Sequence, residues 1–310
     1  MKNLTFGIIG TGALGGYYGG LLAKSGKDVH FLLKSDYQWV KEHGLRVDSV
    51  NGNFTLLNIP VYQHTSEMPK CDVVLVCLKT TSESLLPALL NPIVQKGTTI
   101  VFIQNGLENE KMASALFPDC HLVAGLGFIC SRKVGPGHIE HLDYGKLTLA
   151  MYDSKNKMVL ERIQSAFESS DIQVELSDNL ELARWKKLVW NIPYNGLSVV
   201  LNATTKEMME EEQTKNLIYD IMLEVIGAAN ACGCRIEEKF ADKMLASTMQ
   251  MKPYAPSMKL DYDFNRPMEI HAIYERPIMA ALKASFKMHK TEVVMNQLHF
   301  LQNVKKKRLT

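Results

Sequence analysis

The sequence predicts an α/β fold class, in which an N-terminal doubly wound parallel sheet is followed by an all-helical C-terminal domain. Over the first half of the 310-residue chain, apolar runs of strand length alternate with helix-like segments. A glycine-rich turn directly follows the first of these runs. After about Ser177 the strand pattern stops and the remaining segments have helical periodicity. At roughly 150 residues per domain, the length also suggests two domains.

Nearly continuous apolar runs predict buried strands, as expected where helices cover both faces of a sheet. These runs are residues 4–9, 28–33, 72–78 and 98–103. Helix-like segments alternate with them, at residues 13–25, 82–91 and 108–116. Strands that are separated by helices pair in parallel, which gives the doubly wound arrangement.

Other stretches depart from this alternation. Asn51-Gly52 predicts a tight hairpin, and residues 122–151 form a strand ladder with glycine turns that we expect to be antiparallel. Helices are then expected at residues 180–201, 214–231, 237–250, 267–283 and 290–305. We therefore divide the chain into a sheet domain, residues 1–177, and a helical domain, residues 178–310.

Composition and charge exclude several classes of partner. Lys and Arg number 35 and Asp and Glu 33, and a net charge of +2 is too small for a typical nucleic-acid-binding protein. The uncharged stretch that follows Lys2 is interrupted by glycines, each costing a membrane helix up to about 1 kcal/mol. The six cysteines suit a reducing compartment. We expect a soluble, cytoplasmic protein that binds neither nucleic acid nor membrane.

The pair His138 and His141 comes closest to metal-ligand spacing. On a strand, side chains three positions apart face opposite sides. We therefore predict two surface histidines and no metal site.

The turn Gly10-Thr11-Gly12-Ala13-Leu14-Gly15 fits the pattern G-x-G-x-x-G, directly after a strand and at the start of a helix. The first glycine permits a tight turn, the second lets the backbone approach a pyrophosphate, and the third lets helix and strand pack closely. The helix N-terminus favours the anion. The pattern predicts a Rossmann-type dinucleotide site, with a glycine turn that holds no ligand as the alternative.

The end of the second strand indicates which dinucleotide binds. An acidic residue there would hydrogen-bond the ribose of NAD. Here Leu33 is followed by Lys34, and the nearest acid is Asp36. A lysine can pair with a 2′-phosphate, which favours NADP(H). The alternative is a solvated Lys34, with Asp36 reaching back to the ribose.

A polar stripe marks the segment RWKKLVWNIPYNGLS. Lys187, Asn191 and Asn195 are spaced i, i+4, i+8, which places them within about 80° on one helix face. In a buried cleft the lysine would lose hydration, and its pKa would fall towards a range useful for proton donation. Pro193 should bend this helix. The alternative is the solvent face of an amphipathic helix.

Two further residues have ordinary structural explanations. Pro267 resembles the first residue of a helix, which would place Glu269 in the first turn, where a carboxylate favours the helix dipole. Ser257 follows Pro253 and Pro256 and is expected in a loop.

With these residues in hand, the chain resembles the ketopantoate reductase (2-dehydropantoate 2-reductase) family along nearly its whole length. The matching parts are GTGALG, Lys34, LKT with Lys79, QNG with Asn105, WKKLVWNIPYN and SMKLDYDFNRPMEI. The resemblance implies reduction of the ketone of 2-dehydropantoate to (R)-pantoate with NADPH, in the pathway to pantothenate and coenzyme A.

The resemblance also implies roles for single residues. Lys187 would donate the proton and stabilise the developing alkoxide. Asn191, Asn195 and Ser257 would hold the hydroxyl and carboxylate of the substrate. Glu269 would hydrogen-bond the reacting centre or the cofactor beside Lys187.

The remaining roles concern the cofactor. Asn105 would lie near the nicotinamide ring and the substrate, and Lys34 and Lys79 would serve the adenosine 2′-phosphate. The chain departs from the family's usual pattern at Lys34, where arginine is common, and at Tyr254 and Thr205, where asparagines are common. These departures keep another 2-oxo acid open as the substrate.

Other functions also stay open. One is a hydroxyacid dehydrogenase of the 6-phosphogluconate type, and the segment from Ser257 to Glu269 argues against it. The other is a non-catalytic NADP(H)-sensing protein, which would need no proton donor. A homodimer stays open as well, because the apolar stripes of the helical domain are equally explained by its own core.

Overall fold

The computed structural model describes residues 4–152, 156–253 and 255–309. They fall into two compact units. The first unit consists of the described residues of Met1–Gln104 and Asn109–Leu180, and the second of those of Asn105–Glu108 and Glu181–Thr310. The division that we expected from the sequence lies between residues 177 and 178. The sequence did not indicate that Asn105–Glu108 would group with the second unit.

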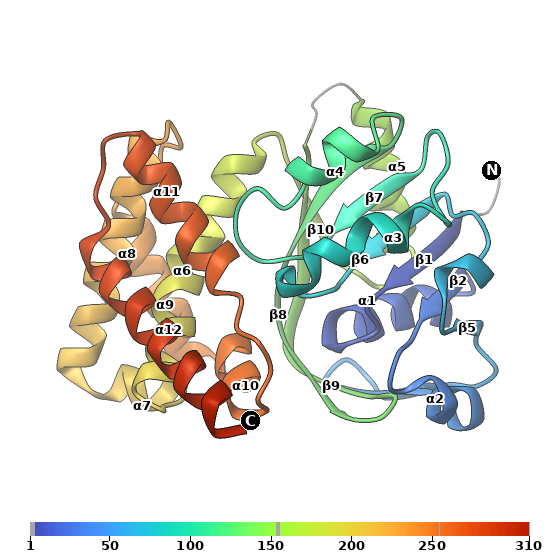
Figure 1. Ribbon diagram of the computed structural model, residues 1–310, viewed down its shortest axis with the longest axis horizontal. Helices are drawn as coiled ribbons and strands as arrows, with labels where there is room; N and C mark the ends of the chain where they lie inside the picture. The colour runs from blue at the N-terminus through green and yellow to red at the C-terminus, as the bar shows by residue number, and fades with distance from the viewer. Residues whose placement is uncertain (1–3, 153–155, 254, 310) are drawn as a thin grey trace. The chain divides into compact units, whose positions relative to one another are not determined.

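The first unit is built on one 10-stranded sheet, in the order β4-β3-β9-β8-β7-β6-β1-β2-β5, with β10 beside β9. The strands are β1 (Thr5–Ile9), β2 (Asp28–Leu32), β3 (Leu45–Ser49), β4 (Phe54–Leu56), β5 (Val61–Tyr62), β6 (Val73–Val76), β7 (Thr99–Phe102), β8 (His121–Gly135), β9 (His138–Met151) and β10 (Val174–Ser177). The run from β5 to β8 pairs in parallel throughout. The doubly wound sheet is therefore confirmed (Figure 1).

Successive residues of the central strands enter different cores. Ile8 packs in one hydrophobic cluster with residues of α1 (Ala13–Lys24) and α5 (Lys157–Glu168). Its neighbour Ile9 packs in another, with residues of α3 (Leu86–Leu90) and α4 (Lys111–Leu116). Adjacent strand residues point to opposite faces. Burial on both faces is why these strands are almost uniformly apolar in sequence.

The helices of the first unit differ from the prediction in detail. The expected helix 82–91 begins as a 3₁₀ segment, Thr80–Leu85, with Ser82 outside helical geometry, and only Leu86–Leu90 is α-helical. The expected helix 108–116 begins later, at Lys111, and Glu108 has a φ of 58°. Helix α2 (Tyr37–His43), α5 and the 3₁₀ turn Thr65–Glu67 were not predicted.

The expected antiparallel ladder is confirmed, since β8 and β9 pair from Val123↔Met151 to Gly135↔His138. The hairpin at Asn51-Gly52 joins β3 and β4, and Gly52 has a φ of 112°. The prediction of a surface His141 is wrong, because only 1% of this residue is exposed. Its Nδ1 lies 2.8 Å from Ser49 Oγ on the paired strand β3, so tertiary pairing buries it.

The second unit is helical, and its described residues contain no strand. Its helices are α6 (Leu180–Val200), α7 (Thr205–Glu210), α8 (Glu212–Ala231), α9 (Lys239–Gln250), α10 (Ser257–Asp263), a π-helical turn (His271–Glu275) that continues into α11 (Arg276–Lys283), and α12 (His289–Leu309). The predicted all-helical character is confirmed. Helix α6 continues through Pro193.

Two local expectations for this unit are wrong. Ser257 is not in a loop but is the first residue of α10, with Pro256 as its N-cap. Pro267 does not begin a helix, so Glu269 lies just before one rather than in its first turn. The backbone N–H of Met268 donates to Gln302 Oε1 at 2.8 Å. This bond ties the segment to α12 across 34 positions of sequence, which the local sequence does not reveal.

In the described parts of the chain, no helix is both long enough and apolar enough to cross a membrane. All six cysteines are free thiols.

Candidate functional site

The glycine turn joins β1 to α1 in the first unit. Gly10 has a φ of 97°, and a Cβ at this position would lie 2.8 Å from the backbone nitrogen of Leu78. A Cβ on Gly15 would lie 2.2 Å from the carbonyl oxygen of Gly10. Thr11 Oγ1 donates to the carbonyl oxygen of Leu32 at 2.9 Å, which ties the turn to the end of β2. Backbone packing therefore requires glycine at positions 10 and 15.

Gly12 differs from these two glycines. A Cβ built on it would meet no atom within 4 Å, so the space beside this residue is open. Gly12 is the N-cap of α1, and the first turn of this helix, which begins with Ala13 and Leu14, contains no acidic residue. The first N–H groups of a helix have no partner within the helix and favour anions. The turn therefore fits a pyrophosphate.

The residues after β2 distinguish the two nicotinamide cofactors. Lys34 is exposed, whereas only 5% of Asp36 is exposed. Asp36 forms an ion pair with Lys133. It also accepts hydrogen bonds from the Gly137 N–H and from Ser35 Oγ, both at 2.9 Å. Burial alone would raise the pKa of Asp36, but these partners outweigh it and lower the pKa. Asp36 is thus engaged elsewhere, which argues against its reaching a ribose.

Lys79, the other lysine assigned to the cofactor, lies between β6 and the 3₁₀ segment Thr80–Leu85. It is half-buried. Its position after the carboxyl end of a central parallel strand is where open α/β sheets bind their ligands.

The polar stripe lies on α6 in the second unit. Lys187 is half-buried, whereas Asn191 and Asn195 are only 6% and 1% exposed. All three lie within one continuous helix, so the spacing of four residues keeps them on one face. The alternative of a solvent-facing stripe does not hold for the two asparagines. Two amides buried on an apolar helix need partners, because an unsatisfied buried polar group costs about 1–3 kcal/mol.

The Asn195 side chain is anchored by the start of α10. Its Oδ1 accepts from the backbone N–H of Met258 at 3.0 Å and from Ser257 Oγ at 3.4 Å. These contacts bring Ser257 and Asn195 together although 62 positions separate them. They also fix the plane of the amide, so that its NH₂ group is the part that can turn towards a ligand.

Asn191 is a different case. Its Nδ2 is buried and has no hydrogen-bond partner among the described residues. It lies one helical turn after Lys187 and one turn before Asn195. A donor held in this state is prepared to bind a ligand oxygen.

Asn105 and Glu269 are also brought together. Asn105 Nδ2 donates to Glu269 Oε2 at 3.4 Å across 164 positions of sequence. Glu269 is only 3% exposed. Its backbone oxygen accepts from Ile273 N–H at 3.1 Å, at the start of the π-helical turn. A buried carboxylate beside an amide donor is typical of a site where polar ligands are held.

The residues that hold Asn105 in place were not predicted from the sequence. Gly106 has a φ of 91°, and a Cβ there would lie 2.2 Å from the carbonyl oxygen of Ala272. Arg184 and Arg276 donate to the carbonyl oxygens of Gly106 and Leu107. The glycine in QNG could have signalled the close backbone approach, but nothing local indicates the two arginines.

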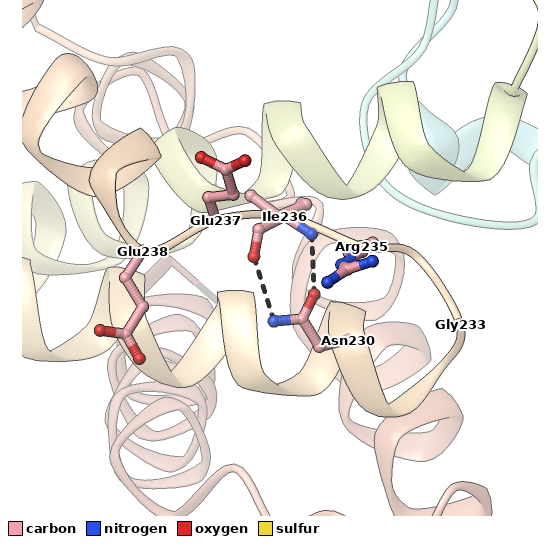
Figure 2. A pocket seen from close by; sticks show the side chains of 6 residues that line it. All are labelled: Asn230, Gly233, Arg235, Ile236, Glu237 and Glu238. Carbon is pink, nitrogen blue, oxygen red and sulfur yellow. Dashed lines mark hydrogen bonds between the residues drawn. The ribbon is translucent and has the colours of Figure 1, made fainter.

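Two other positions depart from the family's usual pattern, Thr205 and Tyr254. Thr205 is only 2% exposed and begins α7, after the Thr204 capping box. Tyr254 is outside the described residues. The pocket of Figure 2, between α8 and α9, is lined by Asn230, Gly233, Arg235, Ile236, Glu237 and Glu238. There the Asn230 side-chain amide hydrogen-bonds both the N–H and the carbonyl oxygen of Ile236, which closes the loop between the two helices. The pocket lining contains no predicted site residue.

For the residues that the structure describes, no cluster of three or more His, Cys, Asp or Glu side chains could hold a metal ion. The polar groups described above are amides, hydroxyls, a lysine and a carboxylate. These groups can orient a small polar substrate and move one proton.

Comparisons with known proteins agree with this arrangement. Residues 6–154 match the family model "Ketopantoate reductase PanE/ApbA", and residues 179–302 match "Ketopantoate reductase PanE/ApbA C terminal". A 2-dehydropantoate 2-reductase of Nostoc sp. is 47% identical over 306 residues, covering 97% of this chain and 96% of the relative.

Solved structures show the same likeness. The 2-dehydropantoate 2-reductase of Geobacter metallireducens has a TM-score of 0.93 and 38% identity, covering 96% of this chain and 99% of that chain. The 2-dehydropantoate 2-reductase of Methylococcus capsulatus has a TM-score of 0.87 and 33% identity, covering 97% of this chain and 98% of that chain. The similarity therefore extends over both units.

Proposed function

The chain belongs to the ketopantoate reductase family, and we propose that it reduces 2-dehydropantoate to (R)-pantoate with NADPH, as a step towards pantothenate and coenzyme A. The observation that carries this proposal is the face of α6 formed by Lys187, Asn191 and Asn195. Two amides of this face are buried, and the Nδ2 of one has no partner among the described residues. Such a face is prepared for a small substrate with several oxygens.

NADP(H) is the cofactor of this family, and the first unit fits it. The open space beside Gly12 and the N-terminus of α1 would receive the pyrophosphate. We propose that Lys34 and Lys79 pair with the 2′-phosphate, because Asp36 is already bound to Lys133, Gly137 and Ser35. When bound, NADPH supplies the hydride to the carbonyl carbon of the substrate.

Lys187 acts on the oxygen of the same carbonyl. Hydride addition breaks the C=O π bond and leaves the electron pair on oxygen. An ammonium held beside that oxygen stabilises the developing charge more than the neutral ketone. It then donates its proton, so that the ketone becomes a secondary alcohol and the lysine is reprotonated by solvent.

The amides and the serine orient the substrate. Asn191 Nδ2 donates to a substrate oxygen, which satisfies its buried N–H groups. The amide of Asn195 is fixed by Met258 and Ser257, and its NH₂ group and the Ser257 hydroxyl hold the carboxylate and hydroxyl of the substrate. This orientation holds the reacting carbon in one geometry, which is a large part of catalysis.

Glu269 and Asn105 complete the site. Their contact at 3.4 Å holds a buried carboxylate and an amide together. We propose that Glu269 hydrogen-bonds the reacting centre or the nicotinamide ribose, and that Asn105 lies against the nicotinamide ring and the substrate.

The second candidate function is reduction of another 2-oxo acid. The buried Thr205 at the start of α7 stands where family members commonly have an asparagine. A hydroxyl that is shorter than an amide leaves a different space for the substrate. We rank this candidate second because the amides and serine of α6 and α10 retain the family pattern.

The experiment follows loss of NADPH absorbance by the purified protein with 2-dehydropantoate, pyruvate and 2-oxoisovalerate in parallel, each also with NADH. We expect kcat/KM for 2-dehydropantoate to exceed that of the other acids by at least 100-fold, since a site built for a substrate hydroxyl rejects analogues that lack it. Preference for pyruvate or 2-oxoisovalerate would establish the second candidate. No turnover of any acid, with NADPH still bound, would contradict both.

We also propose a homodimer in the cytoplasm. Exposed apolar side chains lie on each of the last two helices, since Met279 and Leu282 of α11 and Val293 and Phe300 of α12 are 53–66% exposed, and apolar surface that forms a contiguous patch commonly marks an interface. The free cysteines suit a reducing compartment. Light scattering should give twice the mass of the 34.9 kDa chain, and a monomer at micromolar concentration would contradict the assembly.

A further inference from the structure

The crossing segment Asn105–Glu108 has an unusual place in the fold. Its neighbours on both sides in the chain, up to Gln104 and from Asn109, belong to the first unit, yet the segment itself groups with the second. It lies outside regular helix and strand. Contacts with the rest of the second unit therefore contribute to the position of Asn105.

Backbone contacts with the π-helical turn form part of this attachment. The N–H of Leu107 donates to the carbonyl oxygen of Ala272 at 3.2 Å. Gly106 makes the approach feasible, because its φ of 91° and missing Cβ leave room against Ala272. Ala272 follows Glu269 by three residues, so one short stretch presents both the carboxylate and the anchor for the segment.

Arginine side chains provide the rest of the attachment of this segment. Arg184 Nη1 donates to the carbonyl oxygen of Gly106 at 2.7 Å, and Arg276 Nη1 donates to that of Leu107 at 2.9 Å. Arg184 is only 4% exposed, whereas Arg276 is half-buried. A hydrogen bond from a guanidinium is about twice as strong as one between neutral groups, and burial removes competition from water.

Arg184 also shares a helix with the polar stripe. It precedes Lys187 by three residues on α6, so the two side chains lie on neighbouring positions of one face. Helix α6 thus carries the three residues of the polar stripe, Lys187, Asn191 and Asn195. Through Arg184 it also binds the carbonyl oxygen of Gly106, the residue after Asn105.

The contact between Asn105 Nδ2 and Glu269 Oε2 is sensitive to small movements. At 3.4 Å it lies near the outer limit of a hydrogen bond, and a shift of a few tenths of an ångström breaks it. The bond from Arg184 to Gly106, one residue away, is the short contact that can prevent this shift.

From these contacts we infer that Arg184 is a positioning residue, which holds the crossing segment so that Asn105 meets Glu269 and the substrate. This inference rests on the proposed function, because it gives Asn105 its role there. The Arg184 guanidinium binds the peptide that follows Asn105, so we expect its removal to affect the site through Asn105.

A double-mutant cycle tests this mechanism. Arg184→Met keeps much of the side-chain volume and removes the guanidinium, and we expect it to lower kcat/KM by roughly 10- to 100-fold, which corresponds to one or two hydrogen bonds of a charged group. In an Asn105→Ala background the same change should cost less than threefold, because the residue through which it acts is gone. Arg184→Lys should recover part of the loss.

The matched control is Arg235→Met, which alters an exposed arginine of the same unit and should leave kcat/KM unchanged. An equal loss from Arg184→Met in both backgrounds would overturn the inference. If Arg184→Met does not fold, the same double-mutant cycle is made with Arg184→Lys. We then expect a smaller loss of kcat/KM, which should again be nearly absent in the Asn105→Ala background.

A readout that does not need turnover separates this inference from the proposed function. Amide hydrogen exchange of a peptide covering residues 105–108 should be at least 10-fold faster in Arg184→Met than in Arg235→Met, because the segment loses its bond at the Gly106 carbonyl oxygen and the neighbouring bond from the Leu107 N–H to Ala272 opens more often. Unchanged exchange would contradict the role of Arg184. An inactive wild-type protein with this exchange difference would contradict only the proposed function.

Discussion

The glycine turn of the first unit and the polar face of α6 in the second unit depend on different distances in sequence. In the turn, Gly10 and Gly15 constrain each other across five positions. On the helix face, Asn195 is fixed by Met258 at a separation of 63 positions, and Asn105 meets Glu269 at a separation of 164. A local motif carries its own geometry, whereas a site assembled from distant segments depends on the fold. The following substitutions separate these two kinds of dependence.

The largest effect on stability is expected in the glycine turn, where Gly15→Ala and Gly12→Ala form a matched pair. Gly15→Ala places a Cβ 2.2 Å from a backbone oxygen, and we expect a loss of about 3 kcal/mol in unfolding free energy. Gly12→Ala places its Cβ in open space and only weakens the N-cap of α1, so the unfolding free energy should fall by about 1 kcal/mol or less, while NADPH affinity falls roughly 10- to 100-fold. Urea unfolding and NADPH fluorescence titration measure both. If Gly12→Ala bound NADPH normally, the pyrophosphate would not lie at this turn.

The next effect distinguishes the two asparagines of α6. Asn191→Ala removes a buried donor that has no partner among the described residues, so it should raise KM roughly 10- to 100-fold without lowering the unfolding free energy. Asn195→Ala removes an acceptor for Met258 and Ser257, and it should raise KM and also cost about 1–3 kcal/mol of stability. Steady-state kinetics and urea unfolding test the pair. Equal destabilisation by both changes would show that Asn191 is structural.

A smaller effect is expected at Lys34. Because this lysine is exposed and the neighbouring Asp36 is bound to Lys133, Lys34→Met should raise KM for NADPH by roughly 10-fold and leave KM for NADH unchanged. Lys41→Met, which alters another exposed lysine of the same unit, is the control. An equal change for both cofactors would place the 2′-phosphate elsewhere.

The smallest effect concerns pH and the first unit alone. Burial lowers the pKa of His141, and this outweighs the carbonyl oxygens of Tyr144 and Asp143, which raise it. The groups around the ring are these carbonyls, the charged carboxylate of Asp143, which also raises the pKa, Ser49 Oγ and the Tyr17 ring. Since the unfolded chain binds this proton more readily, stability is full above the unfolded pKa of about 6.5 and falls as pH decreases towards the folded pKa.

Thermal melting at pH 7.5 and pH 5.5 checks this linkage, in which each pKa unit of lowering corresponds to about 1.4 kcal/mol. His141→Gln should reduce the difference between the two melting temperatures. His43→Gln, at an exposed histidine, should not. A larger pH dependence in His141→Gln than in the wild type would contradict the assignment.

The same contrast explains which parts of the fold were predictable. Gly10 to Gly15 could be predicted as a strand–turn–helix because their constraints are local. The spacing of Lys187, Asn191 and Asn195 predicted one face of a helix, but only tertiary packing decided that the asparagines are buried. Glu269 was expected inside the first turn of a helix but lies just before one, in a segment whose Met268 N–H binds Gln302 of α12. No local pattern predicts a bond across 34 positions.

Two further differences have the same origin. His141 is polar in sequence and was expected at the surface, but its pairing with Ser49 across strands far apart in sequence buries it. The crossing segment Asn105–Glu108 groups with the second unit because Ala272, Arg184 and Arg276 bind its backbone. Position in the chain alone would leave it with the first.

The most direct test of the account compares Lys187→Ala with Lys186→Ala. Lys186 is the exposed neighbour of Lys187, so the pair matches charge and helix position. With 2-dehydropantoate and NADPH, we predict that Lys187→Ala lowers kcat by roughly 10²- to 10⁴-fold while NADPH binds as in the wild type, because a proton donor and a counter-charge are lost. Lys186→Ala should keep its kcat. A Lys187→Ala variant with wild-type kcat would contradict the claim that the face of α6 carries the chemistry.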